Sequence, residues 1–188
     1  MNKKALVLAA AIAATALFVN AANADQYSGP DGTITVNGQV VAQTCQVDGQ
    51  TFGTADNQVV NLPSVLSSEL STAGTTAGDT QFHLAVTGCD SALKTVQTYF
   101  SGGDINSAGR LNNSATSPTA GNVQVQFLNG SGNVMNLSGA DATAQSSQVV
   151  NLDSTGAATM SYTARYYATG QATAGAVKST VDFTMIYQ

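Results

Sequence analysis

The sequence predicts an all-β sandwich for this chain of 188 residues. Apolar and polar residues alternate in several separate stretches, which is typical of strands with one buried face. The segments between them are rich in Gly, Ser, Asn, Asp and Thr, which favours turns. Only residues 63–70 look helical, with Pro63 able to open a short turn. Many short strands with few helices favour an antiparallel sandwich, because parallel strands need long crossover connections.

The first 24 residues are predicted to be a targeting segment rather than part of the fold. Lys3 and Lys4 precede an apolar run over residues 5–19, and the segment closes on the small-x-small triplet 22–24, Ala-Asn-Ala. This is the pattern of a secretory signal peptide, which is removed on export. The alternative, a membrane anchor, is disfavoured because the run is shorter than the roughly 20 residues that a span needs.

The charge of the exported chain excludes some classes of partner. After residue 24, four basic side chains stand against eleven acidic ones, and charged residues make up only 9% of the whole sequence. A few scattered cations do not form the basic patch that binds nucleic acid, so no nucleic-acid partner is expected. The weakly charged surface, polar through Thr, Ser, Asn and Gln, suits self-association.

The two cysteines, Cys45 and Cys89, are predicted to form one structural disulfide, as pairs in exported proteins usually do. A bridge closing a loop of this length contributes on the order of 4 kcal/mol in the chain-entropy model. A thiol nucleophile or half of a metal site would be the alternative. The chain has a single histidine, His83, and no CxxC or HxxxH spacing, so neither alternative gains support.

Alternation of period two places the individual strands. In one example Phe82, Leu84 and Val86 alternate with Gln81 and His83, which predicts a half-buried strand with a solvent-facing histidine. Strands are predicted at residues 33–36, 38–47, 80–87, 96–100, 123–127, 160–168 and 180–187, with shorter candidates at 59–62 and 148–152. No fixed repeat and no further domain boundary is visible after residue 24.

The sequence offers no catalytic, metal or cofactor constellation. Most acidic residues lie beside Gly, Ser, Thr or Asn, which turn chemistry explains. There is no calcium-loop pattern, no GxSxG elbow and no phosphate-binding glycine loop. Glu69 is the only glutamate, which disfavours a hydrolase with paired glutamates. We therefore predict a protein that is not an enzyme, with no catalytic residue, no metal and no cofactor.

Both ends of the exported chain carry a recognisable pattern. Residues 32–41 read GTITVNGQVV and lead to Cys45, and Cys89 follows Val-Thr-Gly. Near the other end, residues 164–170 read ARYYATG, and the chain closes on FTMIYQ with a penultimate tyrosine. Together these stretches resemble the mature major pilins of chaperone–usher fimbriae, of which the type 1 fimbrial major subunit is nearest. Residues 102–156 are generic, and Gly-Pro-Asp at 29–31 departs from the family's more regular first strand.

The resemblance implies an incomplete immunoglobulin-like β-sandwich that lacks its final strand and is completed by donor-strand complementation from a neighbouring subunit. A periplasmic pilus chaperone lends a strand first, and at an outer-membrane usher the next subunit's N-terminal arm replaces it. The expected product is a head-to-tail homopolymer, joined to other pilus subunits, that forms an adhesive fimbria on the bacterial surface. Strand addition of this kind takes its affinity from main-chain hydrogen bonds and its register from alternate side chains.

The resemblance also assigns residue roles and three segments. The segments are a signal peptide at residues 1–24, an N-terminal donor extension at 25–36 and a pilin domain at 37–188. The donor residues are expected to be Tyr27, Gly32, Ile34 and Val36. The groove and chaperone-binding strand is expected to present Val181, Phe183, Met185 and Tyr187. The runner-up functions are a minor adaptor or a tip adhesin of the same type of pilus, although such adhesins usually carry an additional lectin domain. An exported β-sandwich enzyme is the third, without a site to support it.

Overall fold

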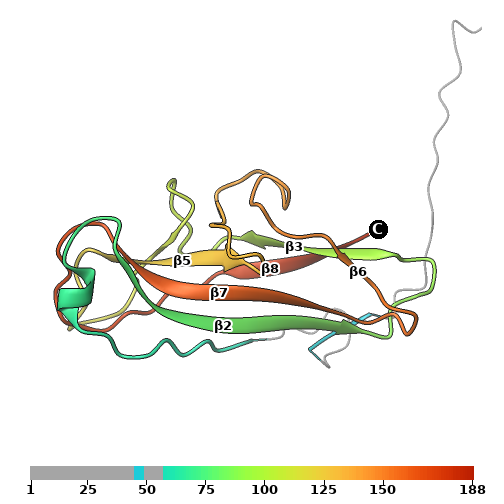
Figure 1. The fold of residues 1–188 in the computed structure, drawn as a ribbon, viewed down its shortest axis with the longest axis horizontal. Coiled ribbons are helices and arrows are strands. Elements are labelled where there is room, and N and C mark those ends of the chain that lie inside the picture. The colour runs from blue at the N-terminus through green and yellow to red at the C-terminus, as the bar shows by residue number, and fades with distance from the viewer. Residues whose placement is uncertain (1–44, 49–56) are drawn as a thin grey trace, which may run out of the picture. The chain divides into compact units, whose positions relative to one another are not determined.

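The computed structural model describes residues 45–48 and 57–188 (Figure 1). The chain divides into two units, residues 1–39 and 40–188, and the described residues belong to the second. Its described part holds two antiparallel sheets and one short 3-10 helix, η1 (Ser67–Leu70). None of its helical segments has the length and apolar character needed to cross a membrane. The predicted all-β class is confirmed.

Five strands form the larger sheet and three the smaller one. The larger sheet has the order β1 (Gln46–Val47), β2 (Thr76–Thr87), β7 (Ala158–Ala168), β5 (Val123–Asn129) and β4 (Leu111–Asn112). The smaller sheet has the order β6 (Val150–Asn151), β3 (Thr95–Ser101) and β8 (Asp182–Tyr187). Figure 1 shows β2, β7 and β5 running side by side, with β3 and β8 forming the second layer.

The long strands confirm the alternation wherever one face is solvated. In β2, Leu84 and Val86 are buried while Gln81 and His83 are exposed, as the sequence predicts. The alternation fails in β3 and β5, where Gln97 and other polar side chains are buried. Residues 130–149 lie between β5 and β6 and reach β3: Gln97 Nε2 donates to the carbonyl oxygen of Ser147 at 2.8 Å. When both faces of a strand are covered, neither set of alternating side chains faces solvent. A polar side chain such as Gln97 is then buried and makes a hydrogen bond within the protein.

The prediction of a strand at residues 59–62 is wrong. Val60 and Leu62 pack against the core while Val59 is 80% exposed, so the alternation is real, but residues 57–66 carry no strand in the structure. Alternating burial needs only an extended chain on an apolar surface, whereas a strand also needs a hydrogen-bonding partner. The predicted helical segment at 63–70 is confirmed only as the single turn η1. Glu69 Oε1 in this turn accepts a hydrogen bond from the amide of Leu66, the residue before the turn, at 2.8 Å.

The core lies between the two sheets and is centred on four aromatic rings. Phe82, Phe127, Phe100 and Tyr162 come from β2, β5, β3 and β7, and four ring pairs among them have centroids 5.3 to 5.5 Å apart. Tilted and edge-to-face aromatic pairs at this distance add roughly 0.5–1.5 kcal/mol each beyond the area they bury. Phe100 is the member from the smaller sheet, so its contacts join the two sheets.

The predicted disulfide between Cys45 and Cys89 is present. Cys45 is 1% exposed and directly precedes β1, and Cys89 lies just after the end of β2, with which β1 pairs. The bridge therefore holds the short strand β1 against its neighbour, where two residue pairs alone would hold it weakly.

Gln145 closes the edge of β3 where β6 ends. Its side chain is fully buried, and Oε1 accepts a hydrogen bond from the Phe100 amide at 2.9 Å. Its Nε2 donates to the Phe100 carbonyl at 2.6 Å and to the Leu137 carbonyl at 2.8 Å. One amide side chain thus makes the two bonds that a neighbouring strand would make to Phe100. Such cover protects an edge from pairing with other chains.

We expect Gln145→Leu to lower the free energy of unfolding by on the order of 3 kcal/mol, because it leaves the amide and carbonyl of Phe100 and the carbonyl of Leu137 buried without a partner. The urea midpoint measures this loss. Gln148→Leu is the matched control, since its side-chain bond to Ser131 is exposed. Equal midpoints for the two variants would contradict the edge-closing role of Gln145.

Replacing both cysteines by serine should lower stability by about 4 kcal/mol, because the bridge spans a sequence separation of 44 residues and its loss frees that loop in the unfolded chain. Thermal unfolding of the double variant, compared with the oxidised chain, measures the effect. An unchanged melting temperature would show that the bridge does not contribute to folding.

Candidate functional site at the β8 edge

β8 is an edge strand with one described partner. It pairs with β3 in a continuous register from Val96 opposite Tyr187 to Ser101 opposite Asp182. On its other side, no strand of the described residues pairs with it. β8 is therefore the one long strand of the smaller sheet that ends the sheet.

The hydrogen-bonding pattern tells which backbone groups face that open side. Thr95 and Gln188 exchange N–H···O bonds of 2.9 and 3.0 Å, so they form a hydrogen-bonded pair. Bonded and non-bonded pairs alternate along antiparallel strands. The amide and carbonyl groups of Phe183, Met185 and Tyr187 consequently point away from β3. They form a row of donors and acceptors along the edge, which is the template for adding a strand.

The side chains of these residues project from the face of the sheet toward the sandwich interior. Val181, Phe183, Met185 and Tyr187 are half-buried and pack against the main core cluster. Asp182 and Thr184, on the opposite phase, are exposed. The predicted groove residues thus form one row on one face, which we call the β8 row. Burial raises the pKa of the Tyr187 phenol, as an apolar surrounding disfavours its anion.

Thr98 lies on β3 beside the middle of the β8 row. It is opposite Met185 in the ladder and fully buried. Its hydroxyl is 3.5 Å from the sulfur of Met185 and 3.5 Å from the sulfur of Met160. Sequence analysis did not single out Thr98, although it shares the inward phase of Val96 and Phe100 and could have been found from it.

Asp104 fixes the segment that enters β8. Its Oδ2 accepts hydrogen bonds from the Thr180 amide at 2.6 Å, the Thr180 hydroxyl at 3.2 Å and the Ser114 hydroxyl at 2.9 Å. The preceding Gly103 has φ +57°, and a Cβ there would lie 2.2 Å from the Thr180 carbonyl oxygen. The loop can therefore approach this closely only with glycine. The sequence predicts Asp104 only as a turn residue.

The predicted donor residues lie outside the described part of the chain. Tyr27, Gly32, Ile34 and Val36, the whole extension at 25–36 and the segment 1–24 are not placed by the structure. The structure therefore describes the predicted acceptor row and leaves the donor assignment a prediction.

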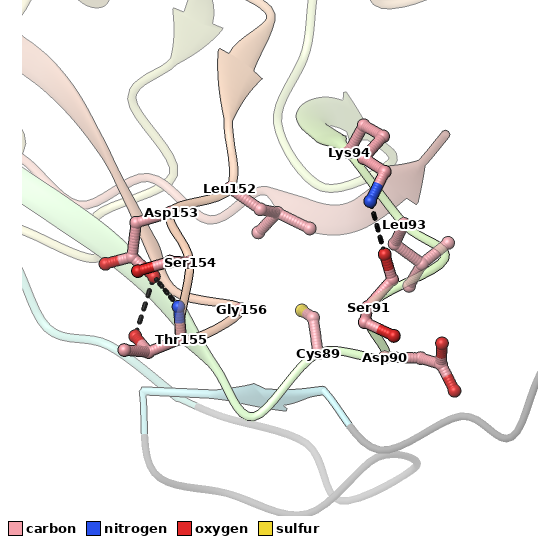
Figure 2. Close-up of a pocket in the computed structure, with 10 residues that line it drawn as sticks. All are labelled: Cys89, Asp90, Ser91, Leu93, Lys94, Leu152, Asp153, Ser154, Thr155 and Gly156. Atoms are coloured by element: carbon pink, nitrogen blue, oxygen red, sulfur yellow. Dashed lines mark hydrogen bonds between the residues drawn. The ribbon is translucent and has the colours of Figure 1, made fainter.

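A concave region lies beside the disulfide, and its polar contacts have a structural explanation (Figure 2). Its polar side chains serve their own loops: Lys94 Nζ donates to the Ser91 carbonyl. Asp153 Oδ1 accepts from the Thr155 hydroxyl at 2.6 Å, from its amide at 2.8 Å and from the Ala157 amide at 3.0 Å. The Thr155 hydroxyl is the largest cause of the lowered pKa of Asp153. These bonds are the turn chemistry that the sequence predicts for its loop aspartates.

The remaining candidate groups also have structural explanations. His83 is exposed, as predicted, and its Nδ1 lies 3.1 Å from the Ser161 hydroxyl. Within residues 45–48 and 57–188, no group of three or more His, Cys, Asp or Glu side chains could hold a metal ion. Among the described strands longer than two residues, β8 is the only one that ends a sheet, so its edge is the candidate site.

Comparisons with known proteins agree on one family. The family model for type-1 fimbrial protein A matches residues 62–188. The chain is 41% identical over 184 residues to the major fimbrial subunit SMF-1 of Stenotrophomonas maltophilia, across 94% of this chain and 99% of that protein. It is 32% identical over 164 residues to the minor fimbrial subunit HifD of Haemophilus influenzae, across 84% of this chain and 74% of that one. A solved chaperone–usher pilus subunit shares the fold, with a TM-score of 0.55 at 20% identity over 86% of this chain and 99% of that one.

The β8 row predicts different outcomes for two neighbouring substitutions. Phe183→Asp puts a charge without a partner into a half-buried apolar row, so it should abolish binding of a peptide that spans residues 25–36. Thr184→Asp lies on the exposed phase and should leave binding within about threefold, in line with the small effect of surface substitutions. Fluorescence anisotropy of the labelled peptide measures both. Equal losses would show that the inward face is assigned wrongly.

Proposed function

Because the chain belongs to the type-1 fimbrial protein family, we propose that it is the major subunit of a chaperone–usher fimbria and polymerises head to tail by donor-strand exchange. It is a fimbrial subunit, and its relatives are structural proteins. The observation that carries the proposal is the β8 edge, where a row of outward backbone groups lies above a half-buried apolar row.

The incoming strand is residues 25–36 of another copy. Its backbone pairs with the outward amide and carbonyl groups of Phe183, Met185 and Tyr187. Its alternate side chains, Ile34 and Val36 foremost, pack on the β8 row. The contact joins main-chain hydrogen bonds to burial of apolar surface, at about 25 cal/mol for each Å² removed from water. Tyr27 and Gly32 are the other two donor residues that the family resemblance assigns.

The donor extension and the β8 row are different surfaces of the same chain. A contact between unlike surfaces does not close on itself, so each subunit that receives an arm still offers its own arm onward, and the product is a filament. The low proportion of charged residues, 9% of the sequence, supports close stacking of copies without strong repulsion.

Before assembly the open edge needs a temporary cover. An edge strand above an apolar row pairs readily with other chains, which leads to aggregation. A periplasmic chaperone covers it by lending a strand, and an outer-membrane usher exchanges that strand for the next subunit's arm. Export through the signal peptide at residues 1–24 brings the chain to the periplasm, and the assembled fimbria extends from the bacterial surface.

A minor adaptor subunit is the second candidate, favoured by the 32% identity to the minor subunit HifD. An adaptor would use the same groove and arm but would occur once or a few times in each fimbria. A tip adhesin is a weaker form of this alternative, because residues 25–188 are predicted to hold one domain and an arm. Immunogold labelling of fimbriae separates the candidates: the rod subunit labels the whole shaft, whereas an adaptor or adhesin labels the tip.

Two neighbouring substitutions in the arm, residues 25–36, should differ strongly in their effect on assembly. Ile34→Asp should abolish assembly, because it carries a charge into an apolar pocket with no partner, at a cost of several kcal/mol. Thr35→Asp, on the opposite phase, should assemble at close to the native rate. Both variants keep their own β8 edge, so both should still be captured by the chaperone. Rods counted by electron microscopy, with chaperone complex measured in parallel, give the readout.

A fusion that supplies a second copy of residues 25–36 after the C-terminus, through a flexible linker, controls for the fold. It fills the groove in cis at high effective concentration, so it should remain monomeric. Rods formed by the fusion would contradict the filling of the groove by residues 25–36. A worse defect from Thr35→Asp than from Ile34→Asp would contradict the proposed donor phase.

A further inference from the structure

Met185 stands apart from the other methionines of the exported chain. The sequence holds four methionines, of which Met1 lies in the predicted signal peptide. Met135 and Met160 are 1% and 2% exposed and belong to the core cluster. Met185 is half-buried and lies in the middle of the β8 row. Two of the three methionine side chains of residues 25–188 are therefore fully buried, and the third lies at the edge where a strand is proposed to be added.

The position of Met185 makes its protection depend on what occupies the edge. Its backbone groups point to the open side of β8, so an added strand pairs with Met185 itself. The side chains of that strand then pack over Phe183, Met185 and Tyr187. Reagents reach the thioether from the open edge and lose that route when the groove is filled. Thr98, beside Met185 on β3, is fully buried, so the sulfur is shielded from solvent on the side away from the open edge.

We propose that Met185 makes the uptake of a donor strand sensitive to oxidation, so that peroxide inactivates a subunit with an empty groove and spares one whose groove is filled. The inference rests on the proposed function, since it requires that the β8 edge accepts a strand. The reaction is a two-electron oxidation by a hydroperoxide. The sulfur lone pair attacks one peroxide oxygen, the O–O bond breaks, an S–O bond forms, and water leaves when the oxidant is hydrogen peroxide.

Oxidation changes the groove at its centre. The sulfoxide is polar and carries an additional oxygen, where an apolar side chain of the donor has to pack. The Thr98 hydroxyl lies 3.5 Å from the Met185 sulfur and has one proton, which it shares with Met160. Oxidation therefore places a polar oxygen, for which Thr98 is the one side-chain donor among these contacts, in a row that an apolar donor side chain has to cover.

The first experiment leaves Met185 as the only sulfide of the exported chain. The variant Met135→Leu with Met160→Leu is unfolded in guanidinium chloride, treated with hydrogen peroxide, freed of peroxide, and refolded with its chaperone. We expect treatment to lower both chaperone capture and subsequent assembly at least tenfold relative to the untreated sample. Methionine sulfoxide reductases A and B together, applied after the denaturant is removed and before the chaperone is added, should restore both, because each enzyme reduces one sulfoxide epimer.

A variant with Leu at all three positions, 135, 160 and 185, is the matched control. It is treated in the same way and compared only with its own untreated sample, because Met185 is part of the groove. Its ratio of treated to untreated assembly should be close to one. If the variant that retains Met185 gives the same ratio as this control, the inference is wrong. Failure of the untreated wild-type chain to assemble would instead contradict the proposed function.

A second experiment uses the wild-type chain and does not depend on variants that fold. The chaperone complex and assembled rods are treated with hydrogen peroxide, and peptide mass spectrometry follows the sulfoxide at each methionine. The subunit that has dissociated from its chaperone is the state with an empty groove, so the complex is treated both with excess free chaperone and after dilution until the chaperone dissociates. Met185 should oxidise faster than Met135 and Met160 in the diluted sample, and at least tenfold more slowly in rods and with excess chaperone. A Met185 rate in the diluted sample equal to that of Met160, or equal to the Met185 rate in rods, would overturn the inference.

Discussion

The half-satisfied strand β8 is the constraint on which the rest of this structure depends. Its side chains belong to the core, yet only β3 among the described strands supports its backbone. The smaller sheet has two edges, and the chain treats them differently. Along β3, β6 and then the Gln145 side chain bond to the backbone, and the Ser147 carbonyl accepts a hydrogen bond from the Gln97 side chain, so that edge is closed from within. The edge of β8 receives no such cover from the described residues, which directs any added strand to one place.

The larger sheet provides the rigid support that this arrangement requires. β2 and β7 share a long ladder, and the disulfide holds β1 to the end of β2. Phe100 on β3 packs edge-to-face on Phe127 and Tyr162 of that sheet, which fixes β3 across the core. β3 in turn sets the register of β8, and Asp104 fixes the segment that enters it. The position of the β8 row is thus determined by residues that never touch an added strand.

The sequence predicted the elements whose physics is local. β2, β7 and β8 alternate because one of their faces is covered and the other is not, and the inward phase of β8 followed directly. Alternation reports which face is covered, not whether a partner strand exists, so residues 59–62 were assigned wrongly. Gln145 and Asp104 were not identified because their partners lie 45 and 76 residues away. The donor residues follow from the family resemblance, and no pattern in residues 25–36 alone would assign them.

Under the proposed function, leaving a strand out of the fold moves part of the folding free energy into the contact between subunits. A complete sandwich would be a stable monomer with no reason to associate. When the final strand comes from a neighbour, the same hydrogen bonds and apolar contacts that would complete the core instead hold two subunits together. Losing the donor then means exposing the half-buried β8 row, so dissociation is as slow as partial unfolding. The same coupling is the reason for the proposed sensitivity of Met185: an added strand would turn a half-buried methionine into a fully buried one.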